Sequence, residues 1–144
     1  MSGHPRFNHV AMSLPADALD ERGRSDIVTF CREVFGWQEI PQMTEDRKRL
    51  VLSAYRFDQF VFLIADERPM EAPRMDHFGL GVDTMDELDD MLDRARAFAE
   101  KDDRVDIVEK SAETYGPVTV TSFYVGYLLP MMVEVQHFNV AEAP

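Results

Sequence analysis

The sequence has a single cysteine, Cys31, among its 144 residues, which excludes an internal disulfide and leads us to expect a cytoplasmic protein. It is also poor in basic residues. It has 15 Lys and Arg residues against 27 Asp and Glu residues. The resulting formal net charge of −12 would repel phosphate backbones and anionic lipid surfaces. No window holds the roughly 18 uninterrupted apolar residues of a membrane-spanning helix, and the first residues lack the apolar stretch of a secretory signal. We therefore expect neither nucleic acid nor a membrane as a partner.

Motifs for nucleotide cofactors are missing as well. The sequence contains no G-x-G-x-x-G, no P-loop and no C-x-x-C, so a nucleotide cofactor has no support. What the chain does have is 45% hydrophobic and 10% aromatic residues, which is enough to bury a core. Its length suits one domain, 1–144, or two small halves that share a core.

The two halves of the chain repeat one pattern. Phe7–Leu14 and Met75–Val82 both alternate in the way of a β-strand, and each has a histidine at its third position, His9 and His77. The two histidines lie close to half the chain apart. Matching histidines in matching strands are the first sign of a shared function.

A helical pattern and three strand candidates follow each histidine strand. Ser25 is expected to cap the first helix, and Gly36 to end it in a left-handed conformation. Thr84, with Glu87 three residues later, forms a capping-box pattern before the second helix. The expected elements are helices over 25–36 and 85–100 and strands over 37–43, 49–55, 59–65, 105–109, 118–125 and 131–138.

This element order predicts two modules, each built as strand, helix, strand, strand, strand. The first is expected at about 6–66 and the second at about 75–139. The segment at about 67–74 contains two prolines and several charges, and it suits an extended linker.

Side-chain alternation places each histidine on a sheet face lined by small residues. His9 shares its face with Ala11 and Ser13, and His77 shares its face with Gly79 and Gly81. The bulky apolar residues of both strands point to the other side, where a helix can cover them. The histidine faces therefore leave space for a ligand.

Glu134 is an acidic residue inside an apolar strand, 131–138. An ionised carboxylate there is costly unless it is paired or bound to a cation. Two neutral imidazoles and one carboxylate suit a mid-row divalent metal, and they leave coordination positions for water, substrate or dioxygen. We therefore expect His9, His77 and Glu134 to be metal ligands.

Simpler interpretations stand beside this one. A histidine near a strand start is commonly a hydrogen-bonded part of the fold. Glu134 could instead pair with an arginine, for which the candidates are Arg6, Arg49 and Arg56.

Other polar or sulfur-containing residues fit the site less well. His137 has the opposite parity to Glu134, and His4 lies in a terminal segment, so neither joins the ligand set. Cys31 has the spacing of a buried core thiol. Met132 shares the face of Glu134 and is expected to be a pocket wall.

Two further segments complete the pattern. The segment 30–37 ends a helix in Phe-Gly-Trp, and ten residues separate Tyr124 from Glu134, with Tyr127–Pro130 between them. Together with the two modules, from about 6 to 138, these features resemble the vicinal oxygen chelate superfamily. That superfamily includes glyoxalase I, extradiol ring-cleaving dioxygenases, fosfomycin-resistance transferases and bleomycin-resistance proteins. Its members often read Asp-Pro-x-Gly before the glutamate, where this chain has Tyr-Leu-Leu-Pro.

The resemblance implies an α+β fold in which two βαβββ modules form a curved mixed-sheet cup, with helices on the outer face. It implies a divalent metal held by the first strand of each module and by the last strand, at His9, His77 and Glu134. It also implies a small-molecule substrate and, since members often pair, a homodimer.

The ligand set favours one chemistry within that superfamily. Glyoxalase I and related isomerases commonly add a fourth ligand from the last strand of the first module, but Gln59–Ala65 has no carboxylate in its middle. The remaining three are similar to the 2-His-1-carboxylate set of extradiol dioxygenases, so Fe2+ is expected, with Mn2+, Zn2+, Ni2+ and Co2+ open. Tyr124 matches a tyrosine that lines the dioxygenase pocket. The acid/base histidine of those enzymes is missing, and Tyr115 is the alternative proton donor, although a phenol with a pKa near 10 is a poor base at neutral pH.

We therefore expect a metal-dependent dioxygenase or lyase that acts on a substrate with neighbouring oxygens. Two alternatives remain open. One is a metal-free binding protein that sequesters a hydrophobic drug, as bleomycin-resistance proteins do. The other is a ferredoxin-like dimer without a site, which has fewer strands per half than this chain.

Overall fold

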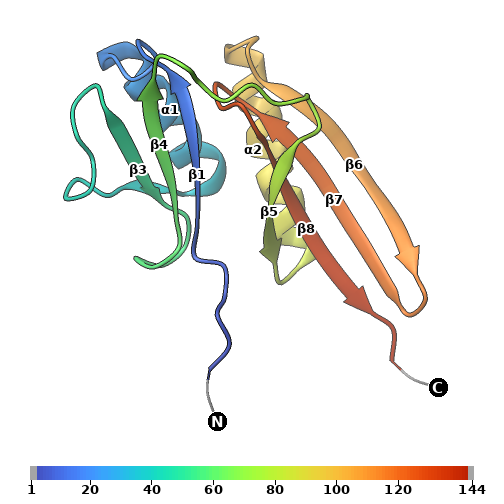
Figure 1. The fold of residues 1–144 in the computed structure, drawn as a ribbon. Helices are drawn as coiled ribbons and strands as arrows, with labels where there is room; N and C mark the ends of the chain where they lie inside the picture. Colours follow the sequence, from blue (N-terminus) through green and yellow to red (C-terminus); the bar gives the residue numbers. More distant parts are fainter. Residues whose placement is uncertain (1–2, 143–144) are drawn as a thin grey trace. The chain divides into compact units, whose positions relative to one another are not determined.

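A computed structural model of the chain describes residues 3–142. The chain divides into two compact units, Met1–Glu71 (unit 1) and Ala72–Pro144 (unit 2). Each unit contains one helix and one mixed four-stranded sheet (Figure 1). The predicted α+β class and the strand-helix-strand-strand-strand order of each half are confirmed.

In unit 1 the strand order is β1-β4-β3-β2. The first and last strands of the module pair in parallel, and the other neighbours are antiparallel. The elements are β1 (His9–Pro15), α1 (Glu21–Phe35), β2 (Gln38–Glu39), β3 (Arg49–Ser53) and β4 (Phe60–Asp66).

Unit 2 repeats this topology with the order β5-β8-β7-β6. Its first and last strands again pair in parallel, and β7 is antiparallel to both β8 and β6. Over residues 3–142, neither helix is long and apolar enough to cross a membrane. The elements are β5 (His77–Val82), α2 (Met85–Lys101), β6 (Asp106–Tyr115), β7 (Val118–Gly126) and β8 (Met132–Val140).

Burial follows the predicted alternation along the histidine strands. On β1, Met12 and Leu14 are buried whereas His9 is exposed. In unit 2, α2 packs across one face of the sheet, and the middle residues of β7 and β8 on that face are buried. Apolar burial on the helix side is what fixes which side chains are left on the other face. The buried residues of this layer are Leu88, Leu92, Ala95 and Phe98 from α2 and Phe123, Val125, Val133 and Val135 from the sheet.

The start of α1 corrects one prediction. The helix begins at Glu21 and not near Ser25, and its N-cap is Asp20, whose side chain accepts a hydrogen bond from the Gly23 N–H. The first turn lies at the surface, so it has no apolar periodicity to signal it. The predicted end is confirmed, since Gly36 has a φ of 75° and donates its N–H to the Arg32 carbonyl.

Two strands differ in length from their predictions. β2 is only Gln38–Glu39, because pairing with β3 ends after the Ile40 N–H bonds to Val51 and Pro41 has no N–H to continue. β6 is longer than predicted and extends to Tyr115. Its outer half is exposed and polar, so it does not alternate as a half-buried strand would.

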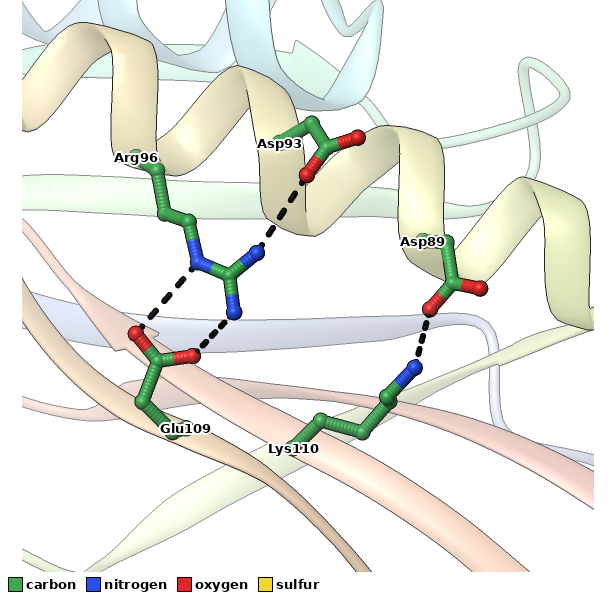
Figure 2. A network of polar contacts seen from close by, with 5 residues as sticks. All are labelled: Asp89, Asp93, Arg96, Glu109 and Lys110. Carbon is green, nitrogen blue, oxygen red and sulfur yellow. Dashed lines mark hydrogen bonds and ion pairs between the residues drawn. The ribbon is translucent and has the colours of Figure 1, made fainter.

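A β-bulge interrupts β6 between Val108 and Ser111. It brings the consecutive side chains of Glu109 and Lys110 to the same helix (Figure 2), where Glu109 contacts Arg96 at 2.5 Å and Lys110 contacts Asp89 at 2.6 Å. These surface pairs add little stability. The bulge matters for the other face of the sheet, because it shifts the alternation of β6 by one residue.

The turn before β8 has the sequence Tyr-Leu-Leu-Pro in place of Asp-Pro-x-Gly, and hydrogen bonds of Tyr127 hold it. The buried Tyr127 donates its hydroxyl hydrogen to Asp102 at 2.7 Å and accepts a hydrogen bond from Arg104 at 2.9 Å. Hydrogen bonds from Arg104 and Tyr127 hold the pKa of Asp102 well below its usual range. Leu128 turns the chain with a positive φ of 57°. β8 then enters the sheet with Met132 opposite His77, which sets the position of Glu134.

Candidate metal centre

The residues of interest in unit 2 share one face of its sheet, which we call the histidine face. Strand pairing places Glu134 of β8 between two neighbours, Gly79 on β5 and Tyr124 on β7. Directly paired residues point to the same side of a sheet. The histidine face therefore comprises His77, Gly79 and Gly81 of β5, Ser122 and Tyr124 of β7, and Met132, Glu134 and Gln136 of β8.

A backbone contact fixes the orientation of His77. Its Nδ1 lies 2.8 Å from the carbonyl oxygen of Met75. A carbonyl oxygen only accepts, so Nδ1 carries a proton, and in the neutral form of the ring the free electron pair is on Nε2. This is the second contact that metal-binding histidines usually make.

The Nε2 atom of His77 lies 3.6 Å from Oε1 of Glu134. That separation is longer than an N–H···O hydrogen bond of about 2.7–3.2 Å. Two ligand atoms that bind one ion at about 2.1 Å lie roughly 3.0–3.4 Å apart. The observed 3.6 Å is slightly wider than this spacing, and the donor types fit such an ion.

Glu134 is buried, with 7% of its surface exposed. Tyr124 supports it by a hydrogen bond from its hydroxyl. That hydrogen bond raises the pKa of Tyr124 to about 12, with burial and the charge of Glu134 adding to the effect. The rings of His77 and Tyr124 make an edge-to-face contact at a centroid distance of 5.0 Å. His77, Tyr124 and Glu134 therefore form one contact group, and its phenol stays protonated at neutral pH.

The two glycines keep this group open on the side of β5. A Cβ atom on Gly79 would lie 3.8 Å from Oε1 of Glu134 and 3.5 Å from Oε1 of Gln136, and one on Gly81 would meet nothing within 4 Å. A larger side chain on Gly79 would occupy the space beside the carboxylate.

Two residues of the histidine face were not predicted to belong to the site. Gln136 follows Glu134 by two residues on β8 and is partly buried. Ser122 of β7 pairs with Gln136 and is buried. Both could have been found from the sequence by the same parity that singled out Glu134. Neither residue type is a common ligand of a mid-row divalent metal, so a pattern of metal ligands does not include them.

His9 has a matching environment in unit 1. Its Nδ1 lies 2.6 Å from the side-chain oxygen of Asn8, and its ring stacks on Phe60 at a centroid distance of 4.8 Å. Because the amide oxygen accepts, Nδ1 is the donor, and Nε2 again has the free electron pair in the neutral form of the ring. Within either unit, over residues 3–142, no three His, Cys, Asp or Glu side chains gather as a metal site. That His9 joins His77 and Glu134 on one ion stays a prediction.

Tyr115 lies apart from this group. It is at the end of β6, opposite Val118, which pairs with Val140, and six residues of β8 separate Val140 from Glu134. That is about 20 Å along the strand. The Tyr115 hydroxyl donates to Glu113, and this hydrogen bond raises the pKa of Tyr115. The structure does not bring Tyr115 together with His77 and Glu134.

The remaining candidates have other surroundings. Cys31 is buried, and burial raises the pKa of its thiol to about 12, which is the inert core thiol expected. His137 lies on the helix side of β8 by its pairing with Val82 and Thr121. His4 is exposed. The arginines considered for Glu134 have carboxylate partners in unit 1, where Arg6 and Arg56 pair with Asp58 and Arg49 pairs with Glu45.

Comparison of the structure with solved structures defines the class of fold. The chain has the vicinal oxygen chelate fold, with similar structures that cover 92% or more of it. A lactoylglutathione lyase from Agrobacterium tumefaciens has a TM-score of 0.66 at 17% identity, covering 94% of this chain and 96% of its own. No family profile and no curated protein sequence matches the chain.

Two other similar structures have different functions in their names. The fosfomycin resistance protein FosX from Mesorhizobium loti has a TM-score of 0.62 at 13% identity, covering 94% of this chain and 93% of its own. A glyoxalase/bleomycin resistance protein/dioxygenase family enzyme from Burkholderia phytofirmans PsJN has a TM-score of 0.59 at 16% identity, covering 92% and 97%. At these identities the likeness is one of fold.

Proposed function

We propose that this protein is a divalent-metal-dependent enzyme that acts on a small substrate with neighbouring oxygens. His9, His77 and Glu134 are the proposed ligands. The observation that carries the proposal is the pair of His77 and Glu134, whose facing Nε2 and Oε1 atoms are 3.6 Å apart while Nδ1 is held by the Met75 carbonyl. A buried carboxylate beside an unprotonated imidazole nitrogen is stabilised by a cation between them.

The protein's own residues have distinct roles in this proposal. Bound metal would polarise the substrate oxygens and hold them in place. Tyr124 donates its hydroxyl hydrogen to Glu134, which orients the carboxylate, and its raised pKa keeps it a donor at neutral pH and not a base. Gly79 and Gly81 leave room for the substrate in front of the carboxylate. The Met75 carbonyl and the Asn8 side chain each hold the Nδ1 atom of one histidine, which leaves Nε2 of both rings for a ligand.

Iron(II) is the proposed metal, and ring cleavage of a catechol is the proposed reaction. Two histidines and one carboxylate with open positions are the ligand set typical of non-haem iron(II) oxygenases. One similar structure is named as a member of a dioxygenase family and another as a lactoylglutathione lyase. Lyase or isomerase chemistry is therefore the nearest other outcome within the same proposal.

The test begins with metal uptake by untagged protein under anaerobic conditions. We expect one equivalent of Fe2+ per chain to remain after gel filtration, and we expect exposure to air and catechols to give a coloured ring-opened product. Retained metal without colour would exclude ring cleavage and favour the lyase or isomerase reaction. No retained Fe2+, Mn2+, Zn2+, Ni2+ or Co2+ would contradict the proposal. Stabilisation of the metal-free protein by a hydrophobic drug would then favour a binding function.

A further inference from the structure

We propose that Gln136 forms a polar subsite beside the metal pair, and that it selects substrates with a second, uncharged hydrogen-bonding group. This inference rests on the proposed function, because it takes His77 and Glu134 as the place where substrate oxygens chelate the metal. It adds that the second group lies within about 7 Å of those oxygens, the distance between alternate residues of a strand.

The position of Gln136 supports this assignment. It follows Glu134 by two residues on β8, so both side chains leave the sheet on the histidine face. Its paired neighbours are Gly81 on β5 and Ser122 on β7. The space next to it is open, since a Cβ on Gly81 would meet nothing within 4 Å.

The Gln136 amide leans towards the metal pair. Its Oε1 lies 3.5 Å from the point where Gly79 would carry a Cβ, and Oε1 of Glu134 lies 3.8 Å from that same point. A substrate that reaches the metal over Gly79 would therefore pass against the amide as well as the carboxylate.

The chemistry of the amide defines what it would bind. Within the described part of unit 2, the Gln136 side chain makes no hydrogen bond, although it is half-buried. A half-buried amide without a partner is a ready donor and acceptor for a ligand. Because the amide has both N–H donors and a carbonyl acceptor, an uncharged amide or hydroxyl group can pair with both, whereas a carboxylate can only accept.

The experiment uses two catechols that differ in one group. Zn2+-loaded protein is titrated by calorimetry with 3,4-dihydroxybenzamide, which has an amide opposite its chelating oxygens, and with 4-methylcatechol, which has a methyl group there. The wild-type protein should bind the amide compound about three- to tenfold more tightly, which is the effect of one net hydrogen bond. In Gln136→Met this preference should disappear, while zinc content and affinity for 4-methylcatechol stay unchanged. The control Phe138→Leu, two residues further along the same face, should keep the preference.

The outcomes separate this inference from the proposed function. Equal affinities in the wild-type protein, or a preference that survives in Gln136→Met, would overturn the subsite and leave the metal site intact. Loss of zinc from Gln136→Met would also overturn it, because Gln136 would then be a metal ligand. A wild-type protein that retains none of Fe2+, Mn2+, Zn2+, Ni2+ and Co2+ would overturn the proposed function and this inference with it.

Discussion

Replacing Glu134 by glutamine is expected to lower the affinity for divalent metal by about 100-fold or more. Partners of metal ligands, when removed, already cost about 10–100-fold, and Glu134 is proposed as a ligand itself. Glutamine keeps the size of the side chain but removes the negative charge, so the loss should not come from unfolding. His77→Ala should have an effect of the same order. Metal content after gel filtration and competition with a coloured chelator measure both variants.

His137 provides a matched control for this prediction. It is a histidine on the same strand as Glu134, but its pairing with Val82 and Thr121 places it on the opposite face. His137→Ala should therefore bind metal as the wild-type protein does. The account would be contradicted if Glu134→Gln kept its metal, or if His137→Ala lost it.

Replacing Phe123 by alanine is expected to lower the free energy of unfolding by about 3–5 kcal/mol. Phe123 is fully buried on the helix side of β7, opposite Val135, and truncation would leave a cavity in that layer. The next residue, Tyr124, points to the histidine face, so Tyr124→Phe should cost only about 1 kcal/mol, the net value of one hydrogen bond. Urea unfolding followed by circular dichroism gives both values.

This pair of variants tests the alternation that defines the histidine face. Tyr124→Phe should reduce metal affinity by removing the hydrogen bond to Glu134, whereas Phe123→Ala should act on stability. Equal destabilisation by the two neighbours would mean that β7 is not packed on one side only. The assignment of Tyr124 and Glu134 to a common face would then be wrong.

Much of this fold could be predicted from the sequence because it is repeated. His9 and His77 occupy the same place in two strands, and the helices that follow have apolar stripes and recognisable ends at Gly36 and Thr84. The strand alternation also predicted that Glu134 would be buried among apolar neighbours. These signals come from residues that are close together in the chain. Burial on the helix side fixes which residues of each strand point to that side.

The parts that could not be predicted depend on contacts between distant residues. The bulge in β6 lies where Glu109 and Lys110 contact α2, and no pattern within the strand signals it. The partner of the His77 ring is the backbone of Met75, which sequence alone does not place. Strand parity places Gln136 on the face of Glu134, but it does not show that the Gln136 amide lies beside Gly79.

The most direct test of the account is a count of the imidazoles that bind one metal ion. Pulsed electron paramagnetic resonance of copper(II)-loaded protein detects the remote nitrogens of bound histidines. We expect two imidazoles in the wild-type protein and one in each of His9→Ala and His77→Ala. A single imidazole in the wild-type protein, or a spectrum that His9→Ala leaves unchanged, would contradict a site shared by the two halves of the chain.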